Sequence, residues 1–259
     1  MNRLQKLFER KPQNILSIYF TAGFPTLDSV GEIITTLAAN GIDMIEVGIP
    51  FSDPMADGPV IQESSTAALR NGMTLRRLLD DVAAVRCKVP DTPLVLMGYI
   101  NPMMHMGIER LFEECARAGI DAMIVPDLPF DIYLSEFRPL CEKYDIPMIM
   151  LITPETSEER IRLIDNNCDG FIYMVSSAST TGTRDSFNDS QLAYFNRINA
   201  MQLKHPRLIG FGISNARTLA DAHANASGAI IGSKFIKCLA ASHGDIPVAV
   251  TSLISALGN

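Results

Sequence analysis

Short apolar runs recur along the chain, and each is followed by a turn and then by a longer stretch with helical periodicity. This alternation is typical of repeated βα units. The runs are nearly continuously apolar, as expected for parallel strands that are covered by helices on their outer face. Strands are predicted at residues 15–21, 44–48, 94–97, 122–125, 148–152, 170–175, 208–211 and 229–232.

The stretches between these runs carry polar residues on one helical face and apolar residues on the other. Helices are predicted at residues 26–40, 108–118, 133–144, 157–166, 190–204 and 215–224, with a further helix starting near Val60. Asp131 is expected to cap the third of these helices, and Ser157, followed by Glu158 and Glu159, the fourth.

Eight strands that alternate with helices fit either a closed (β/α)8 barrel or a doubly wound open sheet. The chain has 259 residues and no Pro- or Gly-rich linker, and a barrel of this kind needs roughly 250 residues. We therefore expect one α/β domain, a TIM barrel that spans residues 1–259.

Composition limits the possible partners. The formal net charge is −7, which disfavours general affinity for nucleic acid or for an anionic membrane. The five cysteines lack metal-ligand spacing, and the charged N-terminus is neither a signal peptide nor a membrane span. A reducing, cytoplasmic location is expected, and an anionic substrate would need a local pocket of donors.

In a barrel of this kind, chemistry takes place where the strands run into their following loops. Two of these loops are long, at residues 50–59 and 176–189, and long loops in compact domains are usually lids or binding loops. A third segment, residues 101–106, holds Met103, Met104 and Met106. It is either core filling or an adaptable docking surface.

Glu46 lies inside the apolar strand 44–48, where a carboxylate is costly to bury unless it is paired or protonated. Burial would raise its pKa toward neutrality, as a general acid and base requires. The alternative is a structural glutamate in an ion pair at one end of the barrel.

The loop 50–59 offers Asp53 and Asp57 between prolines. Either aspartate could instead cap the helix that starts near Val60. The residues alone leave open which of the two, if either, faces the pocket.

Glycine-containing turns follow the last three predicted strands, at Gly182, at Gly212 and at Gly232 with Ser233. Barrels commonly bind phosphate with backbone N–H groups of the late loops and a helix N-terminus. The simpler alternative is that each glycine only ends a strand.

The sequence lacks the residues that several other enzyme mechanisms require. No lysine lies in a predicted strand, which leaves a Schiff-base aldolase without a nucleophile, and the four histidines are scattered. No dinucleotide or P-loop motif occurs. We therefore expect neither a metal nor an organic cofactor.

The segment from Glu46 to Pro54, followed by Ala56 to Gln62, closely resembles the signature of the tryptophan synthase alpha chain family. Other stretches agree in order and spacing over nearly the whole chain. They are Thr21 to Pro25, Tyr99 with Asn101 and Pro102, Asp127 to Pro129, Thr181 with Gly182, Gly210 to Ser214, and Gly232 with Ser233.

This resemblance implies a lyase that splits indole-3-glycerol phosphate into indole and glyceraldehyde 3-phosphate, without a cofactor, in an alpha2beta2 assembly with a beta subunit. It implies that Glu46 is the acid and base, that Asp57 contacts the indole N–H, and that Tyr173 supports both. The other implied positions are Tyr19, Tyr99 and Asp127 in the indole pocket, Gly182, Gly212, Ile213, Gly232 and Ser233 at the phosphate, and Thr181 as a lid residue that bonds Asp57 on closure.

Two positions depart from the family pattern: Ser179 replaces a glycine in the loop after strand 6, and Lys234 replaces a small residue after Ser233. Three alternative functions remain. The chain could be a free-standing lyase that needs no partner, a weakly catalytic subunit that activates a partner, or another phosphate-sugar barrel such as an isomerase. The long match from Pro50 to Gln62 speaks against the last.

Overall fold

A computed structural model describes residues 2–176 and 186–258 of the chain. All eight strands are parallel and close into a barrel in sequence order, with β8 paired to β1. The α/β barrel predicted from the hydrophobic pattern is confirmed, and the open-sheet alternative is excluded. The strands are β1 (Ile15–Thr21), β2 (Met44–Gly48), β3 (Leu94–Met97), β4 (Ala122–Ile124), β5 (Met148–Ile152), β6 (Ile172–Val175), β7 (Arg207–Gly210) and β8 (Gly228–Ile231).

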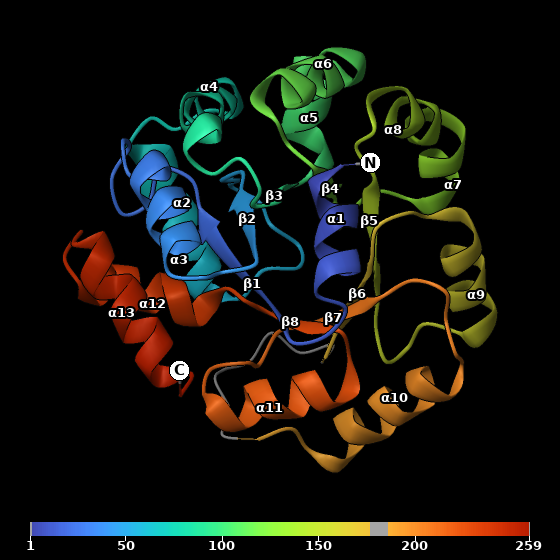
Figure 1. Ribbon diagram of the computed structural model, residues 1–259. Coiled ribbons are helices and arrows are strands. Elements are labelled where there is room, and N and C mark those ends of the chain that lie inside the picture. Colours follow the sequence, from blue (N-terminus) through green and yellow to red (C-terminus); the bar gives the residue numbers. More distant parts are fainter. Residues whose placement is uncertain (1, 177–185, 259) are drawn as a thin grey trace.

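The helices lie around and over the strands: most form an outer ring, and the first lies across one end of the barrel (Figure 1). They are α1 (Arg3–Arg10), α2 (Val30–Ala39), α3 (Pro59–Arg70), α4 (Leu75–Val85), α5 (Ile100–Met106), α6 (Ile108–Ala118), α7 (Phe130–Ile132), α8 (Arg138–Tyr144), α9 (Glu158–Asn167), α10 (Asp189–Ala200), α11 (Ala216–Asn225), α12 (Ser233–Ala241) and α13 (Ile246–Ala256), with a 3-10 turn at Arg86–Lys88 and a π-helical turn at Tyr133–Phe137.

Local sequence explains where several helices begin and end. Ser157 caps α9 by accepting a hydrogen bond from the Arg160 N–H, as predicted. Pro59 occupies the first position of α3, where a missing N–H costs nothing. Gly119 ends α6 in the left-handed region, with φ of 77°.

Helix α1 covers the amino-terminal end of the barrel. Leu4 and Leu7 are fully buried, and the Asn2 side chain donates to the carbonyls of Asp121 and Asp145. Arg3 donates to Asp121 Oδ1 at 3.0 Å. Because Asp121 also accepts from Arg86 Nη1 at 3.3 Å and from the Leu94 N–H at 2.9 Å, this buried carboxylate ties α1 to the start of β3.

Some predicted boundaries are wrong. Strands β7 and β8 each lie one residue earlier than predicted, because Phe211 adopts a left-handed φ of 70° and Gly232 already precedes α12. Strand β6 begins at Ile172, since Gly170 turns with φ of 84°. Strand β4 ends one residue earlier than predicted, at Ile124.

Several helix bounds also differ from the prediction: α9, α10 and α11 each start one residue away, and α10 ends at Ala200 instead of residue 204. Helix α2 begins at Val30, after a turn in which the Ser29 hydroxyl donates to the carbonyls of Phe24 and Thr26. Asp131 does not cap a helix, because α7 already begins at Phe130. The segment after β3, predicted to be a loop, is helix α5; it buries Met103 and exposes Met104.

Candidate active site

The residues that face the barrel interior are set by strand register. Tyr19 on β1 pairs with Glu46 on β2, and Tyr173 on β6 pairs with Leu208 on β7. Paired residues of parallel strands point to the same face of the sheet. All three polar side chains are buried, with exposures of 8% for Tyr19, 0% for Glu46 and 4% for Tyr173. Beyond the effect of burial, the charge of Glu46 raises the pKa of both phenols, so the barrel brings together the three strand residues of the predicted site.

Glu46 is a buried carboxyl without a cation. Among residues 2–176 and 186–258 it forms no ion pair, which contradicts the structural ion-pair alternative for the part of the chain that is described. Its Oε1 accepts a hydrogen bond from the Ser17 hydroxyl at 2.9 Å, and its Oε2 has no partner there. Burial raises the pKa of Glu46 to about 7, although the Ser17 hydrogen bond opposes that shift. The carboxyl therefore exchanges a proton near neutral pH.

Asp57 reaches the site from the loop between β2 and α3. Its Oδ2 accepts a hydrogen bond from the Tyr99 hydroxyl at 3.0 Å, and that hydroxyl also accepts from the Ala56 N–H at 3.0 Å. Burial raises the pKa of Asp57, and the Tyr99 hydrogen bond opposes the shift. The Tyr99 ring stacks on Phe51 with centroids 5.3 Å apart, so one tyrosine holds the loop at two points.

Asp53 and Asp57 differ in environment. Asp53 is exposed and accepts a hydrogen bond from its neighbour Ser52, whereas Asp57 is only partly exposed. Neither aspartate caps α3, because Gly58 occupies the N-cap position without a side-chain bond. The alternative left open by the sequence, that one of them is a helix cap, is wrong.

Two tyrosine rings occupy space that glycines leave free. A Cβ added to Gly48 would lie 2.2 Å from the Tyr19 hydroxyl oxygen, and one added to Gly210 would lie 2.1 Å from that of Tyr173. Burial raises the pKa of both phenols, and the carboxylates of Glu46 and Asp57 raise it further. Both hydroxyls therefore stay protonated and present neutral donors beside the two acids.

Asp127 lies at the edge of this group. Its Oδ1 accepts a hydrogen bond from the Ile100 N–H at 2.9 Å, at the first residue of α5. Burial raises the pKa of Tyr99, the residue before Ile100, and the negative charge of the same carboxylate raises it further. Asp127 thus supports the segment that carries Tyr99.

The predicted phosphate residues lie at the ends of β7 and β8. Gly212 has a φ of 77°, a conformation that glycine adopts without strain, and Ile213 is buried at the same turn. Gly232 is the N-cap of α12 and Ser233 its first residue, so the free N–H groups of that helix directly follow β8, the strand next to β7. Thr181, Gly182 and Ser179 lie outside the described residues.

Sequence reasoning missed two residues of this site. Ser17 bonds Glu46, and Phe51 stacks on Tyr99. The signal for Ser17 was available: it is a hydroxyl within the apolar run 15–20, two positions before Tyr19 and therefore on the same face of β1.

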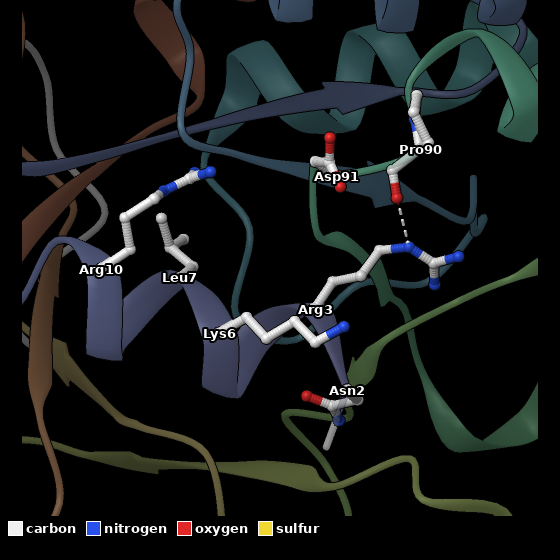
Figure 2. Close-up of a pocket in the computed structure, with 7 residues that line it drawn as sticks. All are labelled: Asn2, Arg3, Lys6, Leu7, Arg10, Pro90 and Asp91. Carbon is white, nitrogen blue, oxygen red and sulfur yellow. Dashed lines mark hydrogen bonds between the residues drawn. The ribbon is translucent and has the colours of Figure 1, made fainter.

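A cavity of about 530 Å³ lies at the opposite end of the barrel, lined by Asn2, Arg3, Lys6, Leu7, Arg10, Pro90 and Asp91 (Figure 2). Arg3 Nε donates to the Pro90 carbonyl across it at 2.6 Å. It adjoins α1 and the segment before β3, away from the carboxyl ends of the strands. Within the described parts of the chain, no group of three or more His, Cys, Asp or Glu side chains is placed to hold a metal ion.

The fold and the site together define the class of the protein as a (β/α)8 barrel in which two carboxyl groups with raised pKa values, Glu46 and Asp57, lie among buried tyrosines. The model of the family called tryptophan synthase alpha chain matches residues 4–257. The chain belongs to this family, whose reaction is the cleavage of indole-3-glycerol phosphate in tryptophan biosynthesis.

Individual relatives agree with that assignment. The tryptophan synthase alpha chain of Phocaeicola vulgatus is 56% identical over 259 residues and covers 100% of both chains. That of Parabacteroides distasonis is 55% identical over 257 residues, or 99% of each chain. Among solved structures, the alpha chain of Legionella pneumophila superposes with a TM-score of 0.88 at 30% identity, covering 99% of this chain and 96% of that one.

A tryptophan synthase structure from M. tuberculosis in an aminoacrylate-bound form matches with a TM-score of 0.85 at 27% identity, covering 99% and 98% of the two chains. The family predicted from the signature around Glu46 is therefore confirmed, as are the lyase activity and the place in tryptophan biosynthesis. The isomerase alternative is excluded.

Proposed function

We propose that Glu46 is the general acid and then the general base of indole-3-glycerol phosphate cleavage. In its protonated form it donates a proton to C3 of the indole ring, which makes the side-chain carbon bond breakable. The resulting carboxylate then takes the proton of the adjacent side-chain hydroxyl, the carbon–carbon bond breaks, and its electron pair returns to the ring. Glyceraldehyde 3-phosphate and indole leave, and Glu46 is protonated again.

The observation that carries this proposal is the buried carboxyl of Glu46, whose pKa is about 7 and which has neither an ion pair nor a partner for its second oxygen among the described residues. A group that must both give and take a proton works best when its pKa lies near the working pH. Desolvation by the barrel supplies that condition without a metal ligand.

Asp57 is proposed to accept a hydrogen bond from the indole N–H and to stabilise the positive charge that develops on the ring after protonation. Its carboxylate is already oriented by Tyr99. Tyr173 would support Glu46 and Asp57 with a neutral hydroxyl. Tyr19, Tyr99 and Asp127 would form the indole pocket, where Asp127 would also hold the Tyr99 segment in place.

The phosphate group is proposed to bind at Gly212, Ile213, Gly232 and Ser233. The support is geometric: a left-handed glycine turn after β7 adjoins the N-terminus of α12, and such backbone N–H groups bind anions well. Gly182 and the lid residue Thr181 belong to the same proposal on the family resemblance alone.

Replacement of Glu46 by Gln tests the central step, because the amide keeps the shape of the side chain but exchanges no proton. Indole release should fall by at least about 100-fold, the usual contribution of acid–base catalysis, while the affinity for glycerol phosphate stays unchanged. Asp57→Asn should also lose most activity, and Asp53→Asn serves as the control in the same loop. Retention of a tenth of the activity by the Glu46 variant would remove it from this role.

The family also implies a beta subunit as partner, and we propose an alpha2beta2 assembly. Met55 and Met104 are strongly exposed, at 85% and 63%, on loops and helices that follow β2 and β3. They support a docking surface beside the active site, whereas Met103 fills the core. Indole release measured with and without the cognate beta subunit separates this proposal from a free-standing lyase and from a weakly catalytic activator.

Single-domain organisation over residues 1–259 is likewise a proposal, supported by one continuous buried cluster that runs from Leu4 to Leu257. Within the described residues, the helices are all too short or too polar to cross a bilayer. The five cysteines are free thiols, and this fits the proposed cytoplasmic location, since that compartment is reducing.

A further inference from the structure

Glu46 is held by a single neighbouring group in the described structure. Ser17 is fully buried on β1, and its hydroxyl donates to Glu46 Oε1 at 2.9 Å. In the sheet register Ser17 pairs with Met44, two residues before Glu46, so it lies one interior layer closer to the amino-terminal end of the barrel. It therefore contacts the carboxyl from the side away from the open end.

The register neighbours of Ser17 and Glu46 offer no other donor to the carboxyl. Ser17 pairs with Met44 and Ile230, and Glu46 pairs with Val95 and Tyr19. Three of these side chains are apolar, and the Tyr19 hydroxyl lies 3.4 Å from Thr21 Oγ1 and forms no hydrogen bond with Glu46 in the described structure. If the Ser17 hydroxyl were absent, neither Glu46 oxygen would have a hydrogen-bond donor among the described residues.

The two oxygens of Glu46 are consequently not equivalent. A donated hydrogen bond occupies Oε1, whereas Oε2 is buried and has no partner in residues 2–176 and 186–258. In the neutral acid the proton resides on Oε2. A proton on Oε1 would make that oxygen a poorer acceptor for the hydrogen bond that the Ser17 hydroxyl donates. A donor on one oxygen thus selects the other for proton transfer.

We infer that Ser17 is a positioning residue for the reaction: it anchors Glu46 Oε1 and leaves Oε2 as the atom that gives a proton to the substrate and takes one back. This inference rests on the proposed role of Glu46. Ser17 lies one layer below Glu46 and contacts its Oε1, so its effect passes through the orientation and acidity of the carboxyl.

The same contact tunes the acid. A hydroxyl donor stabilises the carboxylate more than the neutral acid, so Ser17 offsets part of the burial that raises the pKa of Glu46. The other titratable groups around Glu46 are Tyr19 from β1 and Tyr173 from β6, with Asp57 beyond them from the loop after β2. The two phenols stay neutral near pH 7, and only Asp57 needs a separate control.

The test is the Ser17→Ala variant, which removes the hydroxyl without adding volume. Glu46 is titrated directly by carbon-13 NMR of its labelled carboxyl, assigned by the loss of its signal in Glu46→Gln. We expect the midpoint to rise by about one pH unit, since a hydrogen bond to a charged group is worth at least that much. The descending limb of kcat against pH should move upward equally, with kcat reduced about tenfold at its optimum and KM little changed.

Three controls keep the result specific. Ser17→Cys retains a weak donor and should fall between the wild type and Ser17→Ala in midpoint and kcat. Ser65→Ala removes another buried serine hydroxyl, on α3, that makes no hydrogen bond with Glu46 in the described structure, and should leave both unchanged. Repeating the titration in Asp57→Asn removes the neighbouring carboxyl.

An unchanged Glu46 midpoint in folded Ser17→Ala would overturn the inference, and so would a kcat equal to that of the wild type. The NMR titration needs no turnover, so it tests the Ser17 contact even if Ser17→Ala is unstable above room temperature. Full activity of Glu46→Gln, by contrast, would overturn the proposed function itself. The two failures are therefore distinguishable.

Discussion

Tyr99 is the side chain through which the loop carrying Asp57 is fixed to the barrel. Its hydroxyl donates to Asp57 Oδ2 at 3.0 Å and accepts from the Ala56 N–H at 3.0 Å. The Tyr99→Phe variant removes both hydrogen bonds, but it keeps the ring that stacks on Phe51. It therefore tests how Tyr99 orients Asp57 separately from how Tyr99 packs against the loop.

The magnitude follows from the environment of the carboxylate. Hydrogen bonds to charged groups contribute about 1.5 to 3 kcal/mol, and Asp57 is only partly buried, so we take the lower value of about 1.5 kcal/mol. Since 1.4 kcal/mol corresponds to about a factor of ten, kcat/KM should fall about tenfold. The lost bond to Ala56 should lower the melting temperature by only about 2 to 4 °C.

The assay is steady-state indole release by wild type, Tyr99→Phe, Asp57→Asn and the double variant. Because Tyr99 is expected to act through Asp57, the double variant should be no worse than Asp57→Asn alone. Tyr144→Phe is the matched control, since that hydroxyl also donates to a carboxylate, Glu113, but lies outside the site. Additive losses in the double variant would refute the view that Tyr99 works by orienting Asp57.

Three further changes test other parts of the structure. Gly212→Val should weaken glycerol phosphate binding at least about tenfold. The control Gly41→Val, at a similar φ of 78° but with open space around it, should lower stability only. Equal affinities of the two variants for glycerol phosphate would place the phosphate site elsewhere. Asp121→Asn should leave Arg86 poorly paired and lower the free energy of unfolding by about 3 kcal/mol, with kcat unchanged. This loss corresponds to a decrease in melting temperature of about 6 to 12 °C. A decrease of less than about 2 °C, the shift expected for under 1 kcal/mol, would contradict the anchoring of α1. Burial lowers the pKa of His223, so folding favours its neutral form: stability is complete above the unfolded pKa of about 6.5 and declines as pH falls through it. Denaturant titrations at pH 7.5 and 5.5 should therefore show a smaller difference for His223→Gln than for the wild type, and equal differences would refute this assignment.

Much of the barrel is predictable because its strands are buried on both faces. The predicted bounds of β1, β2, β3 and β5 agree with the structure, since each is an apolar run with clear ends. The end of β7 is not predictable in this way: Phe211 is apolar and extends the run, but its φ is positive, and hydrophobic patterns carry no information on φ.

Helix α5 was not predicted, for a related reason. Asn101 and Pro102 are typical turn residues, yet Pro102 lies in the first turn of the helix, where its missing N–H is not needed. Glu46 was identifiable because a carboxylate in an apolar strand is anomalous. Composition and spacing alone did not separate Asp57 from Asp53, and only the family resemblance favoured Asp57. The environment of each carboxyl depends on where Tyr99, two residues after β3, places its hydroxyl, and sequence patterns do not show this.

The packing of Tyr19 against Gly48, and of Tyr173 against Gly210, restricts how the proposed indole pocket can be redesigned. In each pair the ring of one strand fills the space above a residue without a side chain on the neighbouring strand. Substitution of either glycine by alanine would displace the facing ring, and removal of either ring alone would leave a cavity. Enlarging the pocket for bulkier indoles, or reshaping it by directed evolution, should therefore proceed through paired exchanges across adjacent strands, and libraries that vary one position at a time would miss the productive combinations.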